Sequence, residues 1–295
     1  MLSFLNYFIS GLSLGSIYAI IALGYTMVYG IAKMLNFAHG DFIMIGCYMI
    51  FTIVSTMGLP PVAGIIVAVI VCTILGVTTE KVAYKPLRGA SSPLAVLITA
   101  IGVSYLLENA ALLIFGADTK SFTSVISWSG ITLAGGQLKI QGGTIVTIAV
   151  SLLILVFLQL FVHKTREGQA MLAVSQDRGA ATLMGINVNK TISITFAIGS
   201  ALAAIAGALL CSAYPSLTPY TGAMPGIKAF VAAVLGGIGS IPGAMIGGLV
   251  LGIIEILSRT YISSQLSDAI VFSILIIVLL VKPTGILGKN IQEKV

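Results

Sequence analysis

Residues 164–190, KTREGQAMLAVSQDRGAATLMGINVNK, form the longest polar segment between two strongly apolar runs of the chain. Its charged residues are Lys164, Arg166, Glu167, Asp177, Arg178 and Lys190. Residues 179–185 predict a short helix of small and apolar residues, which Gly185 can end in the left-handed conformation. A chain that is otherwise almost entirely apolar needs a reason to keep such a helix outside the membrane. We therefore expect a partner to dock on this cytoplasmic insert.

The composition around this segment is that of an integral membrane protein. Of 295 residues, 58% are hydrophobic and only 8% are charged, and the mean hydropathy is +1.10. A soluble fold of this length could not cover itself with so few charges. The apolar runs are continuous and several reach the length of about 20 residues that a membrane-spanning helix needs. We therefore predict an all-α, polytopic transmembrane helix bundle that forms one domain over residues 1–295.

Eight long membrane spans and one short crossing are expected. The long spans are residues 5–31, 42–58, 61–80, 93–115, 144–163, 191–213, 241–258 and 264–281. Of the 15 lysines and arginines, 11 fall on the side of the insert and 4 on the other, which places the insert and the C-terminus in the cytoplasm and the N-terminus outside. An odd number of crossings must then follow residue 214, so the short apolar piece 226–238 is expected to cross as a thin or broken helix.

Two interruptions are candidate parts of a translocation path or gate. Asn36, His39 and Asp41 lie at a membrane boundary, where a buried polar side chain is costly and usually faces protein or water. The alternative for Asp41 is that it stabilises the start of the next helix. Broken helices often mark a transport path.

The second interruption, residues 236–243, reads GGIGSIPG. Its candidate path residues are Gly236, Gly237, Gly239 and Pro242. Because glycines and a proline cannot continue a helix, the freed backbone groups must be buried in protein or face a wet cavity.

The acidic residues Glu108 and Glu255 lie within the predicted spans. Glu108 has no partner nearby and is a candidate for a functional carboxylate or for a buried hydrogen bond between helices. Glu255 precedes Arg259 by one helical turn, and this spacing favours a structural ion pair. The sequence predicts no metal site and no catalytic residues, and it contains no phosphate-binding loop. If transport is driven by ATP, the motor must be another chain.

Several stretches of the sequence resemble the permease subunits of branched-chain amino acid ATP-binding cassette importers, specifically the H-type permease of the leucine–isoleucine–valine system. The stretches that carry the resemblance are residues 24–31 (GYTMVYGI), 36–40 (NFAHG), 80–88 (EKVAYKPLR), 184–187 (MGIN), 228–230, 232–248 and 283–288 (PTGILG). The resemblance implies a subunit of the bacterial inner membrane that forms half of a translocation path and has no ATPase site of its own. The implied partners are a second permease, two ATP-binding subunits that hold ATP and Mg, and a soluble extracytoplasmic binding protein.

The same resemblance implies a role for the insert. The family marks its ATPase-coupling helix Glu-Ala-Ala-x-x-x-Gly, and Ala180, Ala181 and Gly185 fit that spacing. Gly179 stands where the family has Glu, so polar contacts are expected from the two residues just ahead of it. The full expected coupling set is Asp177, Arg178, Gly179, Ala180, Ala181, Leu183 and Gly185.

The substrate implied by the resemblance is a branched-chain or related amino acid. The alternative is a stand-alone secondary transporter or channel for a small polar solute such as urea or an amide. Asp41, Glu108 and the two interruptions would serve that alternative. Disruption of residues 177–185 distinguishes the two hypotheses, because only an ATP-driven subunit needs the helix to dock.

Overall fold

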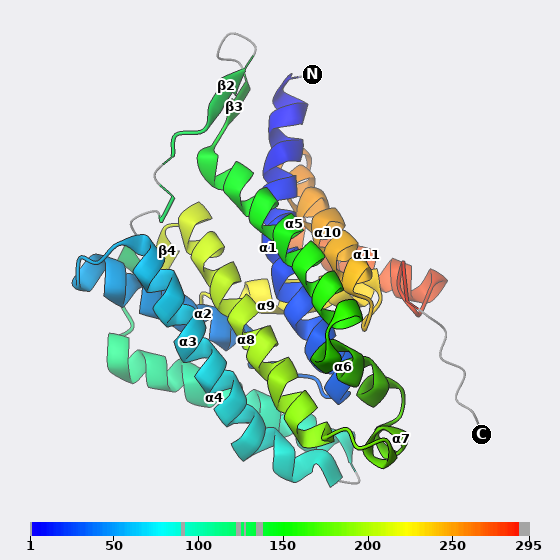
Figure 1. Cartoon of the computed structure of the whole chain (residues 1–295). Helices are drawn as coiled ribbons and strands as arrows, with labels where there is room; N and C mark the ends of the chain where they lie inside the picture. The colour runs from blue at the N-terminus through cyan, green and yellow to red at the C-terminus, as the bar shows by residue number, and fades with distance from the viewer. Residues whose placement is uncertain (1, 90–91, 122–124, 127, 134–137, 289–295) are drawn as a thin grey trace.

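The computed structural model describes residues 2–89, 92–121, 125–126, 128–133 and 138–288, and it forms a helix bundle with two short strand pairs (Figure 1). The longest helices are α1 (Leu2–Ala32), α3 (Pro61–Thr79), α4 (Pro93–Phe115), α5 (Gly142–Lys164), α8 (Val188–Ala213) and α10 (Ile241–Tyr261). α2 (His39–Phe51) continues into a π-helical turn, Thr52–Thr56, and α3 continues through Glu80–Tyr84 and Lys85–Gly89. The prediction of an all-α polytopic bundle is confirmed.

Seven segments of the described chain are long and apolar enough to cross a membrane, and two more apolar helices are shorter. The shorter ones are α9 (Ala223–Gly236) and α11 (Ser267–Val281). The eighth long span expected from the sequence, residues 264–281, is therefore a helix of only 15 residues. The 14 residues of α9 extend about 21 Å, which is shorter than the roughly 30 Å apolar core of a bilayer.

The core of the bundle surrounds α1, which packs against both α8 and α10, whereas α3, α4 and α5 leave most of their apolar surface exposed. α1 and α10 approach so closely that a Cβ on Gly252 would lie 2.1 Å from the Gly15 nitrogen. A Cβ on Gly248 would lie 2.4 Å from the Ala19 backbone. Small residues let the two backbones touch, which is how helices pack in lipid when no hydrophobic force drives them together.

The first interruption lies within the bundle. α1 ends at Ala32, Lys33 has a φ of 52°, and the chain returns so that His39 begins α2 beside Gly24 of α1. Gly24 precedes the end of α1 by eight residues, about 12 Å along the helix axis. α2 therefore starts inside the bundle rather than at its end.

The second interruption is a tight turn between α9 and α10. Gly237 and Gly239 have φ values of 104° and 94°, which residues other than glycine rarely adopt. The carbonyls of Leu235 and Gly236 accept hydrogen bonds of 2.9 Å from the nitrogens of Ile286 and Leu287. The freed backbone groups are thus paired with the chain that follows α11. They are satisfied by protein and not by a water-filled cavity, which is one of the two outcomes expected from the sequence.

The two ends of the bundle differ in character. The strands β2 (Ile131–Leu133) and β3 (Leu138–Ile140) form a hairpin near the N-terminus, and β1 (Lys120–Ser121) pairs with β4 (Ser216–Leu217). α6 (Arg166–Gln176) and α7 (Arg178–Leu183) lie at the opposite end (Figure 1). The insert and the start of α1 therefore lie at opposite ends of the bundle (Figure 1).

Candidate functional site

The insert is held in shape by capping side chains. The Thr165 hydroxyl accepts a 3.0 Å hydrogen bond from the Gly168 nitrogen at the start of α6. The Asp177 carboxylate accepts one of 3.0 Å from the Ala180 nitrogen at the start of α7. Such caps satisfy backbone donors that a helix start leaves open. Asp177, which the sequence analysis assigned to contacts with a partner, is thus occupied with the start of its own helix.

α7 turns one face inward and offers its end to solvent. Ala181 is buried, whereas Leu183 and Met184 are 90% and 82% exposed. α7 ends at Leu183, Gly185 follows with a φ of 81°, and the Ile186 nitrogen donates to the Ala181 oxygen at 3.0 Å. Of the remaining predicted coupling residues, Gly179 and Ala180 are also exposed. Two adjacent apolar side chains outside the apolar body of the bundle form a small surface suited to a partner.

Arg178 connects the insert to the membrane bundle. Its guanidinium donates a hydrogen bond to the carbonyl oxygen of Ala32, the last residue of α1. A cation at this position also complements the negative end of the α1 dipole. Burial, and to a lesser degree the nearby Arg178, lower the pKa of Lys33, which follows Ala32. α7 is therefore joined directly to the point where α1 leads into the first interruption.

A second connection, which the sequence analysis did not identify, joins α3 to the base of α8. Glu80 is fully buried and forms an ion pair with Arg88. The Ser193 hydroxyl donates to Glu80 at 2.6 Å, and Arg88 also donates to the side chain of Asn189. Glu80 and Arg88 lie in a stretch that carried the family resemblance. Two opposite charges at the end of an apolar run were the sequence signal that could have indicated this ion pair.

The first interruption brings three predicted path residues into the interior. Asn36, His39 and Asp41 are all buried. The Tyr84 hydroxyl donates to the side-chain oxygen Oδ1 of Asn36 at 2.8 Å, and the His39 ring lies 4.6 Å from that of Tyr25. Asn36 Nδ2, His39 Nε2 and Asp41 Oδ2 have no hydrogen-bond partner among the described residues. Unpaired buried groups of this kind are costly in a purely structural role.

Glu108 lies on α4, and α4 packs against α2, which carries Asp41 in its first turn. The structure therefore brings the helices of Asp41 and Glu108 side by side, although 67 residues separate the two carboxylates in the sequence. Asp41 also lies in the first turn of α2, where a carboxylate favours the helix dipole. Both interpretations of Asp41 from the sequence are compatible with this position.

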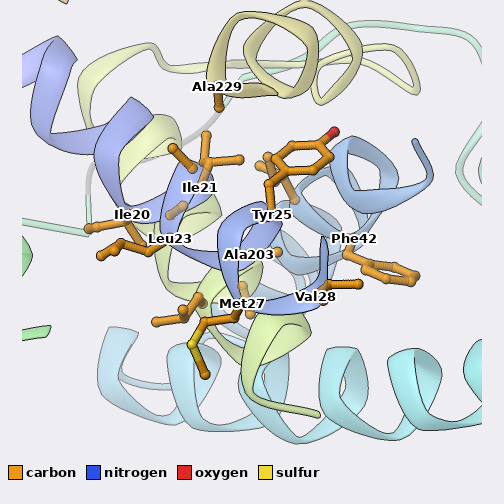
Figure 2. Packing of buried hydrophobic residues seen from close by; sticks show 14 of the residues in the cluster. Ile20, Ile21, Leu23, Tyr25, Met27, Val28, Phe42, Ala203 and Ala229 are labelled. Atoms are coloured by element: carbon orange, nitrogen blue, oxygen red, sulfur yellow. The ribbon is translucent and has the colours of Figure 1, made fainter. Parts of the chain in front are cut away.

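The two interruptions meet along a narrow crevice that has no room for a water molecule in this structure. One wall includes Tyr25 and Asn36, and the other includes Phe230 of α9 and Ile238 of the glycine turn. Figure 2 shows Tyr25 of α1 below the α9 ribbon that carries Ala229, and the rings of Tyr25 and Phe230 are 5.7 Å apart. The crevice is thus the contact between the two broken regions.

The other predicted path residues form the glycine turn itself. A Cβ on Gly236 would lie 2.0 Å from the Gly243 oxygen, and one on Gly237 would lie 2.4 Å from the Gly288 nitrogen. Pro242 occupies the first turn of α10, where its missing N–H costs nothing. Gly236, Gly237, Gly239 and Pro242 therefore shape the backbone, and Ile238 between them reaches the crevice.

A network of charges lies toward the other end of the bundle. Glu255 is fully buried and accepts hydrogen bonds from Tyr18 at 2.9 Å and from Lys228 at 2.8 Å. Lys228 also donates to Asp268 at 2.6 Å. The predicted ion pair between Glu255 and Arg259 is confirmed. Sequence reasoning missed the other members, although a lysine within a short apolar helix was a usable signal because buried charges are expensive in a membrane.

Residues that could hold a metal ion are not grouped in the described part of the chain, where no cluster of three or more His, Cys, Asp or Glu side chains occurs. His39 is surrounded by the Tyr25 and Phe42 rings instead.

The sequence matches the family model described as branched-chain amino acid transport system / permease component over residues 7–279. It is 45% identical to the high-affinity branched-chain amino acid transport system permease protein LivH of Salmonella typhimurium, over 100% of this chain and 98% of the relative. It is 43% identical to the corresponding protein BraD of Pseudomonas aeruginosa, over 99% and 98% of the two chains. A solved structure of PsaBC from Streptococcus pneumoniae in complex with Fab matches with a TM-score of 0.47 and 16% identity, over 95% of this chain and 91% of that chain.

Proposed function

The chain belongs to the branched-chain amino acid transport system permease family, and from this premise we propose that it is the membrane-spanning subunit of an ATP-binding cassette importer in the bacterial cytoplasmic membrane. It forms part of the translocation path for branched-chain amino acids, and ATP is hydrolysed by partner subunits. The sequence identity of 43–45% over nearly the whole chain to proteins named as transport permeases favours this function over a stand-alone channel.

The observation that carries the proposal is the exposed tip of α7. Leu183 and Met184 are among the most exposed large apolar side chains of the described residues, and they lie at the end of the bundle away from the N-terminus. In the proposed complex they fill a cleft of an ATP-binding subunit. The ATP and Mg belong to that subunit, and the cytoplasmic side of the membrane is the side of α6 and α7.

The path from this tip to the membrane is short. Movement of α7 acts through Arg178 on the carbonyl of Ala32 and hence on the segment that leads to Asn36 and His39. Because α2 begins inside the bundle and Asn36 ahead of it lines the crevice, a displacement of this segment changes the crevice between the two interruptions. A hinge of a few residues between two rigid helices is the usual device for such a change.

The remaining partners follow from the architecture of importers of this kind. We place a second permease beside this chain to complete the path. A soluble binding protein would dock at the end of the bundle that carries β1 and β4, with the N-terminus on the same outer side and the C-terminus in the cytoplasm. The clustering of basic residues on the side of the insert supports this orientation.

The test is ATP-dependent uptake of radiolabelled leucine into vesicles that contain the full complex. Leu183→Arg places a charge in the proposed ATPase cleft, and we expect uptake to fall at least tenfold while the permease remains in the membrane. Gln169→Arg adds the same charge at an exposed position of α6 and serves as the matched control, with uptake close to that of the wild type. Normal uptake by Leu183→Arg contradicts the proposed docking.

A further inference from the structure

A cavity of about 300 Å³ lies apart from the crevice between the interruptions, on the half of the bundle that carries β4. It is lined by residues of α1, α8, α9 and α10 and by the segment between α8 and α9. Its volume is at the lower end of the range for small-molecule sites, about 300–1,000 Å³. The cavity is therefore large enough for a small solute.

The charges that face this cavity are cations. Lys228 and Arg259 line it, whereas their partners Glu255 and Asp268 are not among its lining residues. Glu255 is fully buried behind the two cations and accepts from both. The acids therefore hold the cationic groups in place, and the cavity wall presents N–H donors.

Lys228 and Arg259 have N–H groups that are free to donate hydrogen bonds to a ligand. A lysine ammonium has three N–H groups and a guanidinium has five. Described residues accept from Lys228 twice, at Glu255 and Asp268. Arg259 donates to the Ser267 hydroxyl at 3.4 Å and to Glu255. A carboxylate that entered the cavity could accept from the remaining groups, since a carboxylate is the natural partner of a guanidinium fork.

The rest of the wall is suited to a hydrocarbon tail and a polar head. Leu14 of α1, Leu210 of α8 and Met224 of α9 supply apolar surface. The hydroxyls of Ser216 and Thr218 lie in the segment before α9. The cavity thus combines a cationic corner, an apolar side and hydroxyl groups at one edge.

We propose that this cavity binds a free amino acid with an aliphatic side chain, with its carboxylate at Lys228 and Arg259 and its side chain against Leu210 and Met224. The inference rests on the proposed function and names a site on the substrate's route through the permease. The network of two cations and two anions is neutral. A zwitterion leaves it neutral, whereas a simple carboxylate would add a buried negative charge, which is costly.

The experiment uses photo-leucine, a leucine analogue with a photoreactive diazirine, and the full complex in lipid nanodiscs without the binding protein. After illumination, labelled peptides are mapped by mass spectrometry. We expect labelling within residues 210–228, reduced by excess leucine but not by leucinamide, which lacks the carboxylate. If 4-methyl-2-oxopentanoate, which lacks the ammonium group, competes as well as leucine, the assignment to a zwitterion is overturned.

A cavity-filling variant keeps the test independent of the charge network. Ser216 is exposed and lines the cavity, and Ser216→Trp fills it without leaving a buried charge unpaired. We expect at least tenfold less labelling in this variant. Gln265→Trp adds the same side chain at an exposed position that does not line the cavity and should label like the wild type.

Two outcomes separate this inference from the proposed function. Absent labelling, together with ATP-dependent leucine uptake that Ser216→Trp leaves unchanged, overturns the site and leaves the importer standing. A wild-type complex that is labelled at residues 210–228 but takes up no branched-chain amino acid in response to ATP overturns the proposed function and leaves the site.

Discussion

The guanidinium of Arg178 donates a hydrogen bond to the carbonyl oxygen of Ala32, although 146 positions separate the two residues. Arg178 belongs to the short helix α7 of the insert, and Ala32 ends the long, largely buried helix α1. This contact joins the surface proposed for the ATPase to the segment that leads back into the bundle. It explains how a small helix outside the bundle can act on the interior.

Replacement of Arg178 should uncouple the two parts. In Arg178→Met, the α1 carbonyl loses its donor, and we expect ATP-dependent uptake to fall at least tenfold while the ATPase activity of the complex is largely retained. Arg166→Met removes an exposed arginine from α6 and should leave both activities near wild-type values. Uptake and ATPase activity measured on the same vesicles check this, and equal loss of both activities in Arg178→Met argues against a transmitting role.

Asp177 offers a test of capping against partner contact. If its role is to cap α7, Asp177→Asn should behave like the wild type because asparagine caps equally well, whereas Asp177→Ala should weaken the helix by about 1 kcal/mol. Uptake rates of the two variants check this. Comparable loss of uptake in both variants would instead show that the carboxylate charge itself is required by a partner.

Gly24 lies so close to the first interruption that a larger side chain there should destabilise the permease. A Cβ at Gly24 would lie 2.5 Å from His39 Nε2, and Tyr25 restricts how far that ring can move. We expect Gly24→Ala to destabilise the permease by about 1–3 kcal/mol, as overpacking does. Gly102→Ala, on α4 where nothing lies within 4 Å, should be neutral or slightly stabilising because alanine favours helix. Thermal unfolding in detergent compares the two, and equal midpoints would contradict the packing described here.

The buried pair Lys228 and Glu255 predicts non-additive mutations. Lys228→Met removes one of the cations that compensate the fully buried Glu255, and loss of one partner of a buried pair costs about 3–5 kcal/mol. The double variant Lys228→Met, Glu255→Gln should recover much of that stability. Thermal unfolding of the single and double variants measures the coupling, and simple addition of the two single effects would rule out the pairing.

The sequence predicts most of the bundle because its helices are continuous apolar runs. The span predicted over residues 264–281 is longer than α11, which starts only at Ser267. The broken character of α2 could be anticipated from Asn36, His39 and Asp41. The depth at which α2 begins could not, because it depends on packing against Gly24, which no local pattern reveals.

In the candidate sites, too, local features could be predicted from the sequence and long-range contacts could not. The insert and Gly185 were identified from local spacing, and the ion pair of Glu255 with Arg259 from one helical turn. Contacts between distant helices were not predictable in this way. Lys228 was counted among the basic residues of the outer side and in a stretch that carries the resemblance. Its pairing with Glu255 and Asp268 arises from three helices that meet in space.

The docking of α7 on an ATP-binding subunit is the central claim, and site-specific cross-linking tests it most directly. The three native cysteines are all buried, so Leu183→Cys introduces a reactive thiol at an exposed site, with Gln169→Cys as the control. After modification with a maleimide–benzophenone reagent and illumination of native membranes, the adducts are identified by mass spectrometry. We predict that residue 183 is joined to an ATP-binding subunit and that residue 169 gives much less of this adduct. Adducts of residue 183 that contain only copies of this chain, or no protein adduct at all, would contradict the importer function proposed here.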